Sequence, residues 1–206
     1  WSSDVCSSDL FIKGLLQNVP DLKIDSNHMM AISPDEGATG RAIYLANVLG
    51  LDMGMFYKRR DYTRIVDGRN PIVAHEFLGS SVEGKDVIII DDMISSGDSI
   101  LDVAKQLKDR KANRIFAAAT FGLFTNGMKK FDVAYEQGII HGILTTNLIY
   151  QTPELLSKPY YINCDLSKYI ALIIDTLNHD GSISSILSPN ERIQNVVKKY
   201  RNGEKI

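Results

Sequence analysis

Cysteine is scarce in this sequence of 206 residues, which contains only Cys6 and Cys164. Two cysteines are too few for a disulfide framework or for a metal site made of four cysteines. The four histidines offer no metal site either, because no two of them have the His-x-x-x-His spacing that zinc sites use on a helix. A reducing, cytoplasmic setting is therefore expected.

Long apolar runs and a dominant charge are also lacking. No apolar run approaches the roughly 20 residues that a membrane-spanning helix needs. With 23 basic and 25 acidic residues the net charge is −2, so no overall basic field would attract nucleic acid or an anionic membrane. We therefore expect neither as a partner. The composition, 44% hydrophobic and 23% charged, is typical of a globular protein with a single core.

The first ten residues differ from the rest of the chain. They repeat Ser-Ser-Asp at 2–4 and 7–9, and they begin without methionine. They lack the basic start and the apolar core of a signal peptide. They resemble translated adapter sequence left at the end of an assembled read, so we expect residues 1–10 to be a non-native tail; a disordered native tail is the alternative. Residues 11–206 then form the domain, and the natural protein is expected to extend upstream.

Helical and strand-like segments alternate along residues 11–206 and predict an α/β fold. Helical spacing marks 11–19, 39–49, 100–107, 128–135 and 168–177, and short apolar runs mark strands at 29–33, 53–57, 87–90, 114–120, 139–145 and 160–164. Such alternation favours a doubly wound, mostly parallel sheet in a single domain. Residues 58–81 are polar and weakly periodic, and a loop of that length inside a compact domain is usually functional.

The clearest chemical signal follows the apolar, β-branched strand expected at 87–90, which is typical of a strand buried on both faces of a sheet. Two adjacent carboxylates, Asp91 and Asp92, stand at its end, where doubly wound folds bind their ligands. A small polar turn then leads directly into a helix. The turn and the start of that helix consist of Ser95, Ser96, Gly97, Asp98 and Ser99.

This turn has the composition of a phosphate site. Small side chains let backbone N–H groups approach a phosphate, and the helix N-terminus adds further donors. The two carboxylates suit the hydroxyls of a ribose, directly or through Mg²⁺, which prefers oxygen ligands. The alternative is an N-capped helix behind an acidic turn, since serine and aspartate are good caps. A cap alone does not explain two carboxylates at the tip of an apolar strand.

The segment 87–100 resembles the phosphoribosyl-diphosphate-binding signature of type I phosphoribosyltransferases and of ribose-phosphate pyrophosphokinases. In both families a hydrophobic strand, paired acids, two hydrophobic residues and a Ser/Thr/Gly turn follow one another. The resemblance implies a fold of the type I phosphoribosyltransferase kind. It also implies that Asp91 and Asp92 orient the sugar and that residues 95–99 hold its 5-phosphate.

An earlier segment, Ser33-Pro34-Asp35-Glu36-Gly37 with Arg41 four residues later, is similar to the pyrophosphate-binding loop of the pyrophosphokinases. That similarity implies that Asp35 is a magnesium ligand and that the loop backbone binds pyrophosphate oxygens. A Pro-Asp turn that caps the next helix is the alternative.

The basic run Lys58-Arg59-Arg60 is similar to the start of the mobile catalytic loop of the pyrophosphokinases, and it favours that family over the phosphoribosyltransferases. By this resemblance the loop is 58–81, and Lys58 and Arg60 stabilise negative charge on the transferred diphosphoryl group. Phosphoryl transfer depends mainly on positioning and on electrostatic stabilisation, so such a role is physically reasonable. A solvated basic loop is the alternative.

The chain also departs from the pyrophosphokinase pattern. The usual turn after the acids is close to Asp-Thr-Ala-Gly-Thr, whereas this chain has Ser-Ser-Gly-Asp-Ser at 95–99. The polar loop after Lys58 is longer than is typical. Too few residues precede the first strand for the first of the family's two domains, which supplies most of the nucleotide pocket.

The resemblance therefore implies the C-terminal domain of an originally two-domain ribose-phosphate pyrophosphokinase. Its substrates would be ATP and ribose 5-phosphate, its cofactor Mg²⁺, and its products phosphoribosyl diphosphate and AMP. A homo-oligomer is expected for the intact enzyme, and the domain alone is expected to be inactive. Two alternatives remain: a free-standing phosphoribosyltransferase, for which no base-recognising hood is evident, and a non-catalytic regulatory relative.

Overall fold

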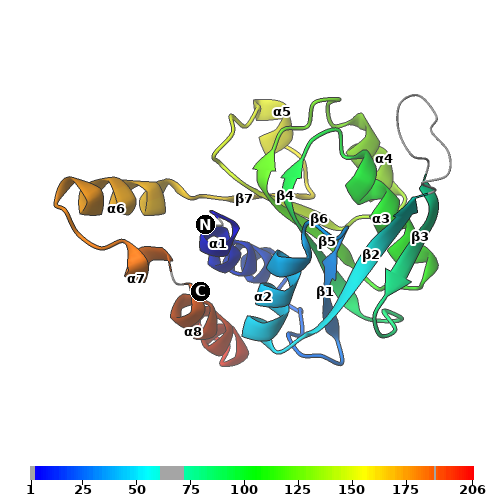
Figure 1. Ribbon diagram of the computed structural model, residues 1–206, viewed down its shortest axis with the longest axis horizontal. Coiled ribbons are helices and arrows are strands. Elements are labelled where there is room, and N and C mark those ends of the chain that lie inside the picture. The colour runs from blue at the N-terminus through cyan, green and yellow to red at the C-terminus, as the bar shows by residue number, and fades with distance from the viewer. Residues whose placement is uncertain (1–2, 61–71, 188) are drawn as a thin grey trace.

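One sheet of seven strands organises the computed structural model, which describes residues 3–60, 72–187 and 189–206 (Figure 1). The order across the sheet is β3-β2-β1-β4-β5-β6-β7. Neighbouring strands are parallel except β2 and β3, which are antiparallel. The strands are β1 (Met29–Ser33), β2 (Asp52–Arg60), β3 (Ile72–Leu78), β4 (Asp86–Ile94), β5 (Ile115–Gly122), β6 (Gly142–Thr146) and β7 (Tyr161–Cys164).

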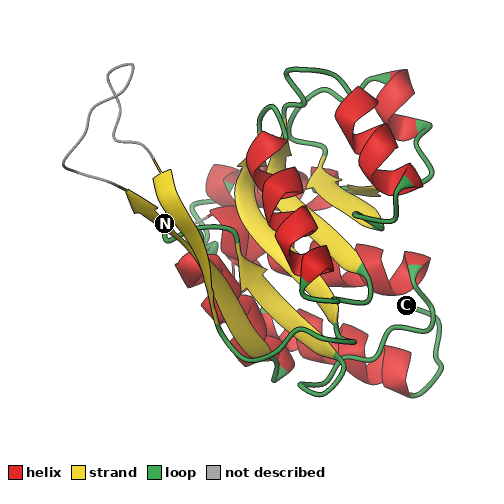
Figure 2. Cartoon of the chain, turned by 90° about the vertical axis from the view of Figure 1, so that its right-hand side faces the viewer, coloured by secondary structure: helices red, strands yellow, loops and turns green. Residues whose placement is uncertain are grey.

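Helices cover both faces of the sheet (Figure 2). On one face α1, α2 and α8 share a core cluster in which Leu45 accompanies Ile88 of β4. On the other face α3 and α4 contribute to a second cluster, in which Val103 accompanies Ile89. The helices are α1 (Ser3–Asn18), α2 (Thr39–Leu49), α3 (Asp98–Asp109), α4 (Lys129–Glu136), α5 (Pro153–Leu156), α6 (Ser167–Asn178), α7 (Ser184–Leu187) and α8 (Asn190–Arg201).

This arrangement confirms the doubly wound, mostly parallel sheet predicted from the sequence. The run 87–90 lies in β4 at the centre of the sheet, with its side chains buried on alternating faces. Within the three described stretches of the chain, no helix combines the length and the apolar character needed to span a membrane.

The disordered tail that was the alternative for the first ten residues is wrong for residues 3–10, which form the first half of α1. The helix is stabilised by long-range contacts, because Phe11 and Leu15 are buried in the core. Asp9 is also buried, and its Oδ2 accepts hydrogen bonds from the Tyr169 hydroxyl (2.6 Å) and from Nε of Arg192 (2.8 Å). The non-native origin proposed for residues 1–10 stays a prediction.

The prediction that one loop covers all of residues 58–81 is wrong. β2 continues to Arg60, and 72–78 form β3, which pairs with β2 so that Lys58 lies opposite His75. Residues 61–71 lie outside the described part of the chain. β3 has apolar residues at 72–74 and 77–78 with His75 and Glu76 between them, so it lacks the strict alternation by which a half-buried strand is recognised.

Candidate active site

The candidate site lies at the carboxyl ends of β1 and β4, which are neighbours at the centre of the sheet. The chain leaves β1 toward α2 on one face and leaves β4 toward α3 on the other. The two connections therefore diverge and open a crevice, which is where doubly wound folds bind ligands. A cavity of about 190 Å³ lies here, lined by Asp35, Asp91, Asp92, Met93, Ile94, Ser95, Ser96, Gly97, Ser99 and Ile100.

The paired acids lie near the carboxyl end of β4, three and two residues before its last residue, and differ in their surroundings. Asp91 is half-buried, and its Oδ1 accepts a hydrogen bond from the backbone N–H of Asp92 (2.8 Å). Burial raises the pKa of Asp91 to about 7; the hydrogen bond from the Asp92 amide opposes this rise, while the neighbouring carboxylates of Asp92 and Asp35 add to it. Asp92 is more exposed, and Nη2 of Arg41 lies 3.6 Å from its Oδ2. The site thus concentrates negative charge that a cation would relieve.

The turn after β4 directs backbone N–H groups toward the cavity. The carbonyl of Ile94 accepts from the amides of Leu123 (2.9 Å) and Phe124 (3.2 Å), and the carbonyl of Ser95 accepts from the amide of Thr125 (3.0 Å). In a trans peptide the N–H points opposite to the carbonyl, so the amides of Ser95 and Ser96 point away from the loop 123–125.

Within the described residues, the amides of residues 95–97 have no hydrogen-bond partner. All three residues line the cavity. Unpaired backbone N–H groups at the start of a helix form a favourable site for an anion. The geometry suits an anion, and we call residues 95–97 the candidate phosphate cradle; that they bind a phosphate stays a prediction.

Glycine is required at position 97 for two reasons. Its φ of 83° is in the left-handed region, where other residues are strained. A Cβ atom there would also meet Cζ of Phe131, on α4, at 2.2 Å. The ring of Phe131 therefore packs directly on the backbone of the turn and holds it against α4.

Asp98 does not line this cavity, although the sequence grouped it with the substrate-binding residues. Its Oδ1 is 2.5 Å from Nζ of Lys130, and its Oδ2 accepts a hydrogen bond from the Ser96 hydroxyl (2.9 Å). The pKa of Asp98 is lowered by these contacts, chiefly by the one with Lys130. Its carboxylate is thus neutralised from α4, and its direct contact with a substrate stays a prediction.

The loop after β1 brings Asp35 to the same cavity. The Ser33 hydroxyl donates to the carbonyl of Asp35 (2.6 Å), and Oδ1 of Asp35 accepts from the amide of Ala38 (3.2 Å). The Pro-Asp turn therefore also stabilises the start of α2, as the alternative interpretation expected. The two interpretations are compatible, because a carboxylate has two oxygens.

These carboxylates fit Mg²⁺ without enclosing it. Among the described side chains, no group of three or more histidine, cysteine or acidic residues is arranged to hold a metal. Mg²⁺ is typically bound by one or two carboxylates and completes its octahedral shell with water and substrate phosphates. Asp35 and Asp92, which line the cavity beside the candidate phosphate cradle, meet that requirement.

The backbones of Lys58 and Arg60 lie at the end of β2, the strand that pairs with β1 on the side away from β4. Met55 is level with Ser33, so residues 56–60 extend past the last residue of β1 at the edge of the sheet that carries the site. The side chains of Lys58 and Arg60 are outside what the structure describes, and their catalytic role stays a prediction.

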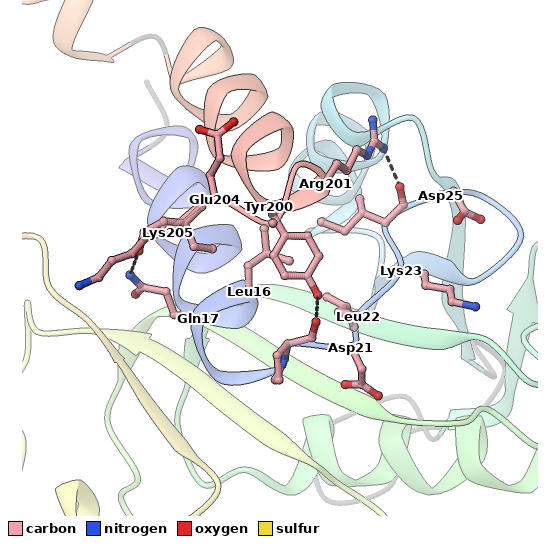
Figure 3. A pocket seen from close by; sticks show the side chains of 14 residues that line it. Leu16, Gln17, Asp21, Leu22, Lys23, Asp25, Tyr200, Arg201, Glu204 and Lys205 are labelled. Carbon is pink, nitrogen blue, oxygen red and sulfur yellow. Dashed lines mark hydrogen bonds between the residues drawn. The ribbon is translucent and has the colours of Figure 1, made fainter.

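A larger cavity, of about 890 Å³, lies at the opposite, amino edge of the sheet, between the segment before β1 and the C-terminal segment (Figure 3). Its charged groups do not converge, because Lys23 and Lys205 point outward on opposite sides. Tyr200 and Arg201 donate hydrogen bonds to backbone carbonyls and hold the two segments together. We therefore place the chemistry in the smaller cavity.

Sequence reasoning left several contributors to the site unassigned. Arg41 was noted only as part of a motif, and Lys130, Phe131 and the loop 123–125 were not considered. Each of them contacts a segment that is distant in the sequence, so no local sequence pattern predicts the contact. Only the alternation of strands and helices, which places β5 beside β4, could have indicated that the loop after β5 reaches the turn.

Comparison with known proteins agrees with this geometry. A family model described as a phosphoribosyl synthetase-associated domain matches residues 65–188. A ribose-phosphate pyrophosphokinase of Shewanella oneidensis is 30% identical over 175 residues, which cover 84% of this chain and 52% of that protein. One of Vibrio cholerae is 29% identical over 160 residues, which cover 77% of this chain and 48% of the relative.

Among solved structures, the crystal structure of phosphoribosylpyrophosphate synthetase from Mycobacterium smegmatis superimposes with a TM-score of 0.68 at 21% identity, covering 85% of this chain and 51% of that one. At this identity the likeness supports the fold. The chain spans about half the length of the curated relatives it matches. It therefore belongs to the ribose-phosphate pyrophosphokinase family, through a domain of the phosphoribosyl synthetase-associated kind.

Proposed function

We propose that this chain is the sugar-phosphate half of a two-domain ribose-phosphate pyrophosphokinase. The intact enzyme transfers the diphosphoryl group of ATP to O1 of ribose 5-phosphate: the bond between the α,β-bridging oxygen and the β-phosphorus breaks, a bond from O1 to the β-phosphorus forms, the hydroxyl proton is released, and AMP leaves. One observation carries the proposal. Asp35, the paired acids and the amides of 95–97 all line one cavity at the point where the strand order reverses.

Each group in the cavity has a role that its chemistry supports. The amides of 95–97 and the hydroxyls of Ser95 and Ser99 bind the 5-phosphate. Asp91 and Asp92 accept hydrogen bonds from the ribose hydroxyls. Asp35 faces the diphosphate together with Mg²⁺, which when bound neutralises phosphate charge.

The remaining roles concern the strand beside β1 and the whole protein. Lys58 and Arg60, at the end of β2, stabilise charge on the diphosphoryl group as it is transferred. We also infer a homo-oligomer and a cytoplasmic location for the intact enzyme, by analogy with a soluble metabolic enzyme.

The first test is binding. Calorimetry with Mg²⁺ present should detect ribose 5-phosphate binding to the chain and no binding of ribose, because the amide cradle recognises the phosphate. The double variant Asp91→Asn/Asp92→Asn should abolish binding while circular dichroism stays unchanged, since both residues lie at a strand tip. Asp109→Asn, at the exposed end of α3, is the matched control and should bind normally. Equal affinity of the double variant and the wild type would overturn the site.

The second test is catalysis. The chain should form no AMP from ATP and ribose 5-phosphate by itself. It should do so when joined to the half of the Shewanella oneidensis relative that it does not match. Turnover by the chain alone would contradict the half-enzyme interpretation. Release of pyrophosphate from phosphoribosyl diphosphate only when a nucleobase is added would instead identify a phosphoribosyltransferase.

A further inference from the structure

An ion pair joins α4 to the phosphate-binding turn. Nζ of Lys130 lies 2.5 Å from Oδ1 of Asp98, and Oδ2 of Asp98 accepts a hydrogen bond from the Ser96 hydroxyl (2.9 Å). Asp98 is the first residue of α3, and Ser96 lines the candidate site. A chain of three contacting side chains therefore runs from the surface of α4 to the cavity.

The position of Asp98 creates an electrostatic conflict. A carboxylate in the first turn of a helix is stabilised by the helix dipole. The same charge lies one residue from Gly97, which lines the cavity, so it repels a phosphate bound there. An opposite charge in direct contact removes most of this repulsion, and Lys130 supplies it.

The contact also decides which groups can donate to a ligand. The Ser96 hydroxyl has one hydrogen, and it is directed at Asp98. Ser96 therefore offers its backbone amide to the cavity, while the hydroxyls of Ser95 and Ser99 remain as side-chain donors. Asp98 thus fixes the rotamer of Ser96.

Other contacts of the same segment brace the turn. Phe131, next to Lys130, packs on Gly97, and the amides of the loop 123–125 bind the carbonyls of Ile94 and Ser95. The segment from 123 to 131 therefore holds the turn through its backbone, through a ring and through a charge. Of these three contacts, only the charge can be removed without disturbing the core, because Lys130 is half exposed and Phe131 is buried.

We propose that Lys130 and Asp98 form a positioning pair for the phosphate cradle, in which Lys130 cancels the charge of Asp98 and Asp98 orients Ser96. In this proposal neither side chain touches the ligand, so Asp98 acts on the substrate through Ser96 in place of the direct contact predicted from the sequence. The inference rests on the proposed function, because it takes the turn at 95–97 to be the site of the sugar phosphate.

The test is a double-mutant cycle on Lys130 and Asp98, in which calorimetry measures the affinity of the full chain for ribose 5-phosphate in the presence of Mg²⁺. Lys130→Gln leaves Asp98 uncompensated and should weaken binding roughly tenfold, as expected for one unscreened charge near the surface. Adding Asp98→Asn to that variant removes the charge itself and should restore affinity to within about threefold of the wild type. Lys130→Arg should bind like the wild type.

Two controls separate charge from structure. Lys129→Gln removes the same charge from the neighbouring position of α4, where the structure records no ion pair in the described part of the chain, and should leave the affinity unchanged. If Lys130 only stabilised the helix, the double variant would bind as weakly as Lys130→Gln. That result, or an unchanged affinity of Lys130→Gln, would overturn the proposal.

A second readout keeps the inference distinct from the proposed function. Carbon-detected NMR should show Asp98 titrating at higher pH in Lys130→Gln than in the wild type. If the wild type fails to bind ribose 5-phosphate, the proposed function falls, and the same cycle is then measured with inorganic phosphate as the probe. Identical titration of Asp98 in both proteins would overturn the pair whichever ligand is used.

Discussion

Arg41 and Asp92 form an ion pair at the candidate site: Nη2 of Arg41, on α2, lies 3.6 Å from Oδ2 of Asp92, near the end of β4. The contact ties the start of α2 to β4. Arg41 therefore places a positive charge beside a group of three carboxylates, and it reduces the negative field that a phosphorylated substrate would meet.

Replacing Arg41 with glutamine should therefore have opposite effects on the affinity for a cation and on the affinity for an anion. Affinity for ribose 5-phosphate should fall roughly five- to tenfold, whereas Mg²⁺ binding without the sugar should strengthen, since one compensating charge is lost. The free energy of unfolding should change by less than about 1 kcal/mol, because the pair is partly exposed. Calorimetry with each ligand measures both effects. Lys105→Gln, an equal change of net charge on α3, should alter neither affinity. A loss of affinity for both ligands in Arg41→Gln would contradict this account.

The raised pKa of Asp91 predicts a pH-dependent stability in metal-free buffer. Between pH values of about 4 and 7 the folded protein keeps the proton that the unfolded chain has lost. The free energy of unfolding should consequently fall as pH rises through this window and level off above it, by about 1–3 kcal/mol after allowing for partial exposure.

Asp91→Asn removes this contribution. Urea unfolding at pH 5, 6, 7 and 8 should show a flatter profile for the variant, which should exceed the wild type in stability at pH 8. Asp109→Asn, at an exposed position, should keep the wild-type profile. Parallel curves for the wild type and Asp91→Asn would show that Asp91 is ionised throughout.

The centre of the fold and of the site could be predicted from the sequence because their signals are local. The side chains of an apolar strand at 87–90 can all be buried only inside a sheet that is covered on both faces. Acids and small residues directly after it must then lie at the carboxyl edge. Asp35 follows a second buried strand, so the rule that ligands bind at this edge also placed it correctly near the acid pair.

The remainder depended on contacts that no local pattern encodes. Residues 3–10 are helical although their composition is polar, because Asp9 meets Arg192 more than 180 residues away in the sequence. Likewise, the pairing of Asp98 with Lys130 follows from the packing of α4 and has no local signal in the sequence. α8 is a different case: Ile193, Val196, Val197 and Tyr200 have the spacing of an amphipathic helix and pack on the core, so this helix could have been predicted from the sequence.

Gly97 and Gly84 provide a matched test of the close approach between the turn and α4. Both have φ in the left-handed region, 83° and 74°, so alanine at either position should cost about 1 kcal/mol in backbone strain. At Gly84 an added Cβ meets nothing within 4 Å, whereas at Gly97 it meets the Phe131 ring at 2.2 Å. Gly97→Ala should therefore lose about 2–4 kcal/mol of stability and at least roughly tenfold in ribose 5-phosphate affinity. Equal effects of the two substitutions in urea unfolding and calorimetry would exclude the steric argument.

Lys58 provides a test of the catalytic role proposed for the end of β2. In the chain joined to the complementary half of the Shewanella oneidensis relative, Lys58→Ala should lower kcat on the order of 10²–10³-fold. The KM for ribose 5-phosphate should change little, because a cation that meets charge developing on the diphosphoryl group acts in the transition state and not on the bound sugar. Steady-state AMP formation measures both constants.

Two comparisons decide how the Lys58 result is interpreted. Lys199→Ala, at an exposed lysine on α8, removes the same charge far from β2 and should leave kcat unchanged. Lys58→Arg keeps the charge but spreads it over a planar group, so it should recover part of the lost kcat and not all of it. A change confined to KM would show that Lys58 acts in substrate binding. A near-normal kcat for Lys58→Ala would show that the basic run at 58–60 is solvated and takes no part in the transfer.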